Sequence, residues 1–141
     1  MKKIIFGTAL SLGCAFFNSM SAFAYQVCQG NEIAAAYQGK WSYEETENNV
    51  NMKVILSAAK DTAQVQVFVN GEEIKAAAQT VNAYTCEKDS VPYIVVTAEG
   101  KTRSSPVKVE GEKLSIYPEI TNENDKPNFE RPEIVFTKLV E

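Results

Sequence analysis

Apolar and polar residues alternate along much of the chain after Lys40, and this alternation constrains the fold more than any other feature of the sequence. A period of two places one face of a strand against a core and the other face in water, as in antiparallel sheets. The alternating runs lie at residues 41–43, 52–56 and 65–69. Asn70-Gly71 follows the third run and suits the two positive-φ positions of a type I′ turn. The pattern therefore predicts a hairpin that pairs residues 62–70 with residues 72–79.

Further strands, which would extend the sheet, are expected towards the C-terminus. They lie at residues 91–98, 105–109, 113–117 and 133–139. About eight short strands in residues 25–141 fit a mainly β fold, a single-domain antiparallel barrel that is closed or nearly closed and so has no long exposed edge. Residues 72–81 remain ambiguous between strand and helix, because Ile74, Ala78 and Val81 also share a helical face.

One short helix is expected ahead of the first strand. Asn31 can accept the first free backbone N–H groups as an N-cap, and Gly39 can adopt the left-handed conformation past the last turn. Ile33, Ala36 and Tyr37 would then share one face. We predict that this helix packs on the sheet that follows it.

The first residues of the chain have the pattern of a secretory signal. Met1-Lys2-Lys3 precedes an apolar run too short to span a bilayer, and Ala22-Phe23-Ala24 supplies a small-x-small cleavage site. The pattern predicts a signal peptide at residues 1–24, cleavage after Ala24, and a bacterial protein that is secreted or periplasmic. Leu12-Gly13-Cys14 resembles the end of a bacterial lipoprotein signal, so lipidation at Cys14 is the alternative. No later apolar stretch is long enough for a membrane span.

Cys28 and Cys86 are the two cysteines that remain after residue 24. In an oxidising compartment such a pair most simply forms a disulfide. On the chain-entropy model a loop of this length contributes about 4 kcal/mol to stability. A redox or metal-binding pair is the rival interpretation, but the spacing is not CxxC and the chain has no His.

The count of zero His excludes several chemistries. Ser-His-Asp and Cys-His mechanisms need an imidazole base, and most zinc sites use imidazole ligands. Carboxylate-pair catalysis stays open, but the acids at residues 44–47 lie in hydrophilic surroundings that would not separate their pKa values. The oxygen-rich segment 122–125 lacks the Gly and the Glu that an EF-hand loop requires. We therefore expect a non-enzymatic protein with no cofactor and no metal.

The charge of the chain disfavours nucleic acid as a partner. Without Lys2 and Lys3, the 14 Lys and Arg of the chain fall to 12 against 18 Asp and Glu, a net charge of −6. Affinity for a phosphate backbone depends on Lys and Arg that displace counterions.

Gly39-Lys40-Trp41 opens the first predicted strand, and with the run of strands after it the chain resembles the lipocalin-like (calycin) barrels. This resemblance implies that Trp41 plugs the closed end of the barrel and that a cationic residue near the end of the last strand packs across its ring. Lys138 matches that position best, and Arg131 fits less well.

Two kinds of partner are compatible with a monomeric binding barrel of this type. A small apolar ligand would lie inside the barrel, although the same side chains would equally well fill a solid core. The candidate lining residues are Tyr43, Met52, Val54, Leu56, Val67 and Phe136. A protein partner would contact loops and outward aromatic residues. The candidates for that role are Phe68, Tyr117 and Phe129, together with the long connection at residues 118–132.

The chain also resembles the small periplasmic inhibitors of bacterial metalloproteases, which share a Gly-x-Trp first strand, one disulfide and an eight-stranded barrel. This resemblance implies inhibition of a secreted or periplasmic hydrolase as the alternative function. Those inhibitors insert a free N-terminal tail into the protease, whereas Cys28 would tether the tail after Tyr25, Gln26 and Val27.

Overall fold

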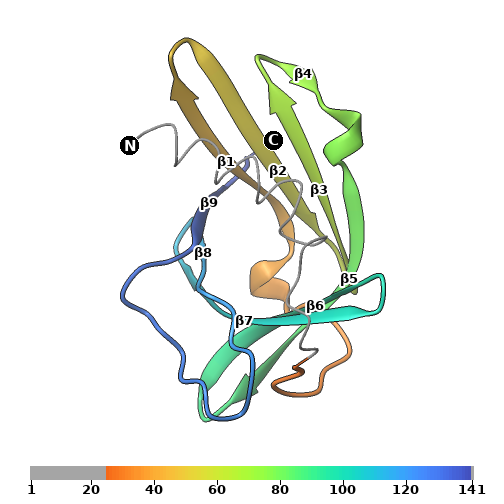
Figure 1. The fold of residues 1–141 in the computed structure, drawn as a ribbon, viewed down its shortest axis with the longest axis vertical. Coiled ribbons are helices and arrows are strands. Elements are labelled where there is room, and N and C mark those ends of the chain that lie inside the picture. Colours follow the sequence, from red (N-terminus) through yellow and green to blue (C-terminus); the bar gives the residue numbers. More distant parts are fainter. Residues whose placement is uncertain (1–24, 141) are drawn as a thin grey trace.

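The protein folds into a closed antiparallel β-barrel (Figure 1). A computed structural model describes residues 25–140. Each barrel strand pairs with the next barrel strand along the chain, and pairing of the first strand with the last completes the ring. The strands are β1 Gly39–Glu47, β2 Val50–Ala58, β3 Thr62–Val69, β4 Glu72–Glu73, β5 Gln79–Lys88, β6 Val91–Ala98, β7 Lys101–Glu110, β8 Lys113–Ile116 and β9 Ile134–Lys138. Eight of them form the barrel, and the two-residue β4 pairs with the end of β3.

The predicted alternation explains which side chains fill the barrel. On β2, Met52, Val54 and Leu56 are buried, and their partners on β3 are also interior residues. The barrel core is formed mainly by Trp41, Met52, Val54, Leu56, Val65, Val67, Val81, Val96, Val107, Leu114, Ile116, Ile134 and Phe136. The expected mainly β, antiparallel barrel is therefore confirmed.

The prediction for residues 72–79 as one strand is wrong. After the Asn70-Gly71 turn the chain forms β4 and then a 3-10 turn, η2, at Lys75–Ala77. The next full strand, β5, lies later than expected and places Val81 and Ala83 in the core. Ala77 is buried against that core, so this short turn carries the chain from the end of β3 across to β5.

The predicted helix at residues 31–39 is also wrong, because the segment contains just a 3-10 turn, η1, at Ala35–Tyr37. Hydrogen bonds from the backbone of residues 33 and 34 hold it to the β2–β3 connection and to β5, and the Ile33 side chain is buried in the barrel core. The Ile33 N–H donates to the Lys60 carbonyl at 2.7 Å, and the Ala34 N–H donates to Thr85 Oγ1 at 2.9 Å. A helix rises 1.5 Å per residue against about 3.3 Å for extended chain, so it would not cover this path.

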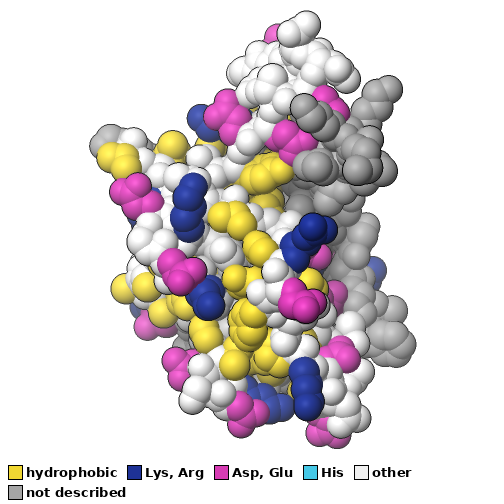
Figure 2. Space-filling view, turned by 90° about the vertical axis from the view of Figure 1, so that its left-hand side faces the viewer, with side chains coloured by type: hydrophobic (Ala, Val, Ile, Leu, Met, Phe, Trp, Pro, Cys, Tyr) yellow, Lys and Arg dark blue, Asp and Glu magenta, His cyan; other side chains and the backbone are white. Residues whose placement is uncertain are grey.

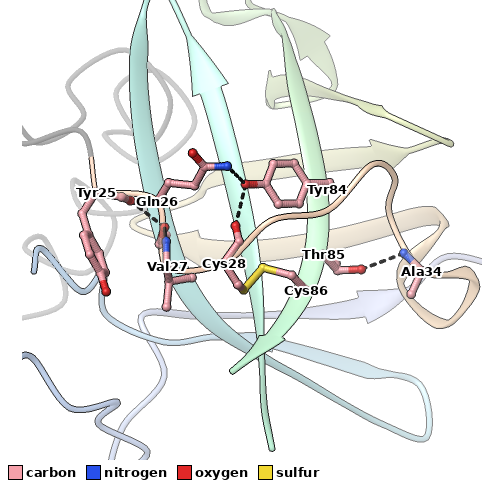
Figure 3. Close-up of a disulfide and its surroundings, with 9 residues drawn as sticks. Tyr25, Gln26, Val27, Cys28, Ala34, Tyr84, Thr85 and Cys86 are labelled. Carbon is pink, nitrogen blue, oxygen red and sulfur yellow. Dashed lines mark hydrogen bonds between the residues drawn. A yellow bond between two sulfur atoms is a disulfide. The ribbon is translucent and has the colours of Figure 1, made fainter. Parts of the chain in front are cut away.

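Residues 25–30 form an N-terminal strap across the outside of β5 to β7 (Figure 3), and the chain then turns so that Ile33 joins the barrel core. The predicted disulfide between Cys28 and Cys86 is present and ties this strap to β5. Ser104 Oγ accepts a hydrogen bond from the Val27 N–H and donates one to the Tyr25 carbonyl. A second apolar cluster lies beneath the strap and contains Val27, Tyr93, Val95 and Ile120.

The predicted signal peptide at residues 1–24, with Cys14 and the cleavage site at Ala24, lies outside the described residues. Within residues 25–140, no helix is long and apolar enough to cross a bilayer.

Candidate functional site

The side chains predicted to line a ligand are located inside the barrel and are largely buried. Met52 and Val67 are fully buried, and Val54, Leu56 and Phe136 are nearly so. Tyr43 is half-buried, and its hydroxyl donates to Glu45 Oε1 at 2.5 Å. Burial raises the pKa of Tyr43, and the hydrogen bond and negative charge of Glu45 raise it further. Five of the six residues thus belong to the packed core.

One cavity within this core is small. Its volume is about 20 Å³, and its walls are apolar. The lining residues are Tyr37, Leu56, Ala58, Ala63, Ile94, Val96, Val107, Leu114 and Ile116. Ligand sites for small organic molecules occupy roughly 300–1,000 Å³. This cavity has room for about one water molecule, and its walls offer few polar groups to hold it.

Trp41 lies at the start of β1 and is 2% exposed. Lys138, its partner across the β1–β9 pairing, places Nζ 4.6 Å from the centroid of the indole ring. The same ammonium donates to the Gln38 carbonyl at 2.8 Å, and Trp41 Nε1 donates to the Tyr37 carbonyl at 3.1 Å. Lys138 is therefore the cation that packs on this tryptophan, while Arg131 is exposed in the loop before β9.

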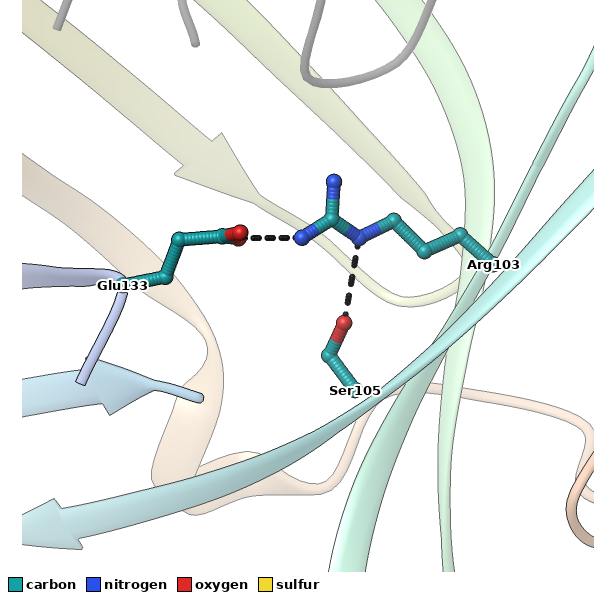
Figure 4. A network of polar contacts seen from close by, with 3 residues as sticks. All are labelled: Arg103, Ser105 and Glu133. Atoms are coloured by element: carbon teal, nitrogen blue, oxygen red, sulfur yellow. Dashed lines mark hydrogen bonds and ion pairs between the residues drawn. The ribbon is translucent and has the colours of Figure 1, made fainter. Parts of the chain in front are cut away.

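Sequence reasoning missed a charged group inside the barrel, Arg103 (Figure 4). Arg103 is 8% exposed and shares its face of β7 with Ser105 and Val107. Its Nε donates to Ser105 Oγ at 3.1 Å, and its Nη2 forms an ion pair with Glu133 at the start of β9. The predicted strand began at residue 105; a start at residue 101 would have placed Arg103 in phase with the inward Val107.

Among the residues predicted to contact a protein, Phe129 is the one that the structure exposes. It is 39% exposed and lies edge-on to Tyr117, with ring centroids 5.0 Å apart. Lys108 on β7 places Nζ 5.4 Å from the Phe129 centroid. Tyr117 itself is 7% exposed, so it supports Phe129 from below and presents little surface of its own.

Phe68 points outward from β3, opposite the interior residues Val65 and Val67, as the alternation predicts. Its neighbours across the sheet are Lys53 on β2 and Glu73 on β4. The Phe68 side chain is half-buried. Phe129 packs on Lys108 of β7 and on Tyr117, which follows β8, and neither β7 nor β8 neighbours β3 in the sheet. The two phenylalanines therefore belong to separate surfaces.

Loop 118–132 has no strand of its own, but several hydrogen bonds hold it in place. The Ile120 N–H donates to the Ser104 carbonyl on β7 at 3.0 Å, and the Ile120 side chain is buried. The Asp125 carboxylate accepts from both the N–H and the hydroxyl of Thr121, and these bonds lower its pKa. The long connection is thus an ordered part of the surface.

One wall of a groove of about 310 Å³ belongs to this loop. Its lining includes the buried residues Val27, Tyr93 and Ile120 and also charged residues of both signs. The charged residues are Lys88, Asp89, Glu123, Asp125 and Lys126. Figure 2 faces the side on which loop 118–132 lies in Figure 1, and shows hydrophobic side chains gathered between charged ones.

The described residues contain no group of three or more His, Cys, Asp or Glu side chains that could hold a metal ion. Ser104 and Ser105 serve as hydrogen-bond partners of the strap and of Arg103. In comparisons with known proteins, no family model, curated protein or solved structure matches this chain.

Proposed function

We propose that this protein is a non-enzymatic binding module whose partner is a protein, and that it works outside the cytoplasm. The observation that carries the proposal is the exposed Phe129 ring, held between Tyr117 and Lys108 on an ordered loop. The disulfide and the signal pattern of residues 1–24 support an oxidising location.

The geometry of Phe129 is favourable for a protein contact. Aromatic side chains contribute much of the binding energy at protein interfaces, most of all where they lie in a well-packed setting. A ring already fixed by an edge-on tyrosine and a lysine loses little rotamer freedom on binding. The bonds of Ile120 and Asp125 restrain the loop in the same way.

A small apolar ligand inside the barrel is the second candidate function and has weaker support. Met52, Val54, Leu56, Val67 and Phe136 belong to the packed core, and the cavity of about 20 Å³ beside Leu56 is far below the volume of such a ligand.

Inhibition of a secreted or periplasmic hydrolase is the alternative form of the protein-binding function. The segment that begins at Tyr25 does not form a free tail, because Ser104 and the disulfide hold it against the barrel. An inhibitory contact would therefore use loop 118–132 and the adjacent groove, by analogy with the rigid loops that carry function in other scaffolds.

Site-specific photo-crosslinking tests the proposal. A photoreactive phenylalanine analogue replaces Phe129, and in a control it replaces Ile74, which is similarly exposed at 38% but follows β4 on another surface. Both variants are expressed in the cells that make the protein. We expect one crosslinked protein from position 129 that position 74 does not yield and that Lys108→Glu weakens. The absence of any crosslinked protein at position 129, or the same products from both positions, would contradict the proposal.

A further inference from the structure

Strand β1 is paired along its whole length on one side and along a short stretch on the other. Its nine residues all have partners on β2, but its pairing with β9 consists of Trp41 with Lys138 and Ser42 with Thr137. From Tyr43 to Glu47, no strand within residues 25–140 pairs with the side of β1 that faces away from β2. In Figure 1 the β1–β2 hairpin rises beyond β9 at this point.

The backbone groups on that side belong to Glu44 and Thr46. The Leu139 N–H donates to the Lys40 carbonyl, so even-numbered residues of β1 direct their backbone groups towards β9. At the other end, the Asn51 carbonyl accepts from the Asn70 N–H, and the Asn51 N–H donates to Asn70 Oδ1. The backbone groups of Asn51 therefore face β3, which leaves those of its partner Thr46 facing away from β2. Two N–H and two C=O groups thus line an open sheet edge.

The side chains of this edge are acidic. Glu44, Glu45 and Glu47 lie within four residues of one another, and Lys53 is the basic residue opposite them on β2. Asn51 Nδ2 donates to Glu44 and to Thr46, which holds both side chains on the outer face. Figure 2 shows acidic side chains gathered at the end of the molecule where this hairpin lies.

We propose that the β1 edge from Tyr43 to Glu47 binds a basic, extended segment of a protein partner as an added strand. Exposed sheet edges recognise extended peptides through backbone hydrogen bonds, and the flanking side chains decide which peptide is admitted. The negative charge favours Lys and Arg in the incoming strand. The proposal deepens the protein-binding function, on which it rests for the class of partner.

The same charge argues against a second copy of this chain as the occupant. Two β1 edges paired with each other would place Glu44, Glu45 and Glu47 of one copy next to those of the other, and like charges across a sheet destabilise pairing. A basic partner strand gains from the charges that exclude self-association.

A titration with a probe peptide of alternating Lys and Val tests this proposal, with an alternating Glu and Val peptide as its control. We expect the basic peptide to shift the backbone amide resonances of Glu44 and Thr46 and the acidic peptide to leave them unchanged. Thr46→Pro removes the outward N–H at an edge position that tolerates proline, whereas Thr46→Val keeps it. Affinity should fall by at least about fivefold in Thr46→Pro and stay near the wild-type value in Thr46→Val.

A probe peptide methylated on alternate backbone nitrogens repeats the test on the wild-type protein, so the result does not depend on the folding of Thr46→Pro. Equal binding of basic and acidic peptides, or equal binding of methylated and unmethylated probes, would overturn the proposal. Crosslinking through Phe129 would still stand in that case. Loss of the Phe129 crosslink with intact peptide binding would instead remove the role of loop 118–132 and leave the β1 edge as the binding site.

Discussion

Lys138 Nζ lies 4.6 Å from the centroid of the Trp41 ring and joins the two ends of the barrel sequence. Trp41 belongs to the first strand and Lys138 to the last, and they are direct partners where β1 and β9 meet. Because the same ammonium donates to the Gln38 carbonyl, this one side chain connects the ring, the closing strand and the segment that enters the barrel.

Replacement of Lys138 by Met should destabilise the protein by about 1–2 kcal/mol, since the aliphatic stem is kept while the cation–π contact and the hydrogen bond are lost. Lys138→Arg retains a cation over the ring and should cost less. Urea unfolding followed by Trp41 fluorescence measures both variants. A loss for Lys138→Arg as large as that for Lys138→Met would show that a positive charge over the ring is not what stabilises this contact.

Gly39 has a φ of +114°, and a Cβ at this position would lie 2.5 Å from Lys138 Nζ. Gly39→Ala should therefore destabilise the protein by about 1–3 kcal/mol, from backbone strain together with displacement of the ammonium. In Gly39→Ala/Lys138→Met no ammonium is left to be displaced. The loss of stability in the double variant should therefore be smaller than the sum of the losses in the two single variants. Gly71→Ala is the control, because its φ is also positive at +85° but nothing lies near the added methyl group. Additive losses in the double variant would contradict the close approach of Gly39 and Lys138.

The strands were predictable wherever one face is buried, because alternation such as Met52, Val54 and Leu56 reports that face directly. The helix predicted at residues 31–39 does not form, and this error has a physical cause. The alanine-rich segments 34–36 and 76–78 have high helix propensity, but each is a short connection between anchored parts of the chain. The first joins the bound Ile33 to β1, and the second joins β4 to β5. A helix of that length does not repay the cost of nucleation, so both segments form 3-10 turns.

The positions of the candidate site residues were likewise predictable only in part. The outward position of Phe68 and the inward position of Val67 follow from the period of two. The contact between Phe129 and Tyr117 and the short β1–β9 ladder depend on how loop 118–132 returns to the barrel. No local pattern in the sequence encodes that path.

Removal of the disulfide should loosen the N-terminal strap more than the barrel. Cys28→Ser/Cys86→Ser should lower the stability by about 4 kcal/mol on the chain-entropy model. Since the Tyr84 hydroxyl also donates to the Cys28 carbonyl at 2.8 Å, the strap should still dock but open more often. Hydrogen exchange should accelerate at Val27 well beyond the change at Val54 in β2, which lies in the barrel core. Equal acceleration at both residues would mean that strap and barrel unfold as one unit.

Glu119 should make the stability of the protein fall as pH rises. Burial raises the pKa of Glu119 above its usual 4.5, the Arg103 guanidinium partly lowers it, and the Glu133 carboxylate raises it. The folded state therefore holds the proton more tightly than the unfolded chain, so this group favours folding below pH 4.5, and that advantage is lost as pH rises through the raised pKa. Glu119→Gln, which stays neutral, should match the wild type at low pH and become the more stable protein at neutral pH. Glu123→Gln removes an exposed carboxylate from the same loop and should show a smaller change with pH. Unfolding free energies measured from pH 4 to pH 8 test this difference. If the effect of Glu119→Gln on the unfolding free energy does not vary with pH, desolvation of this carboxylate does not limit stability.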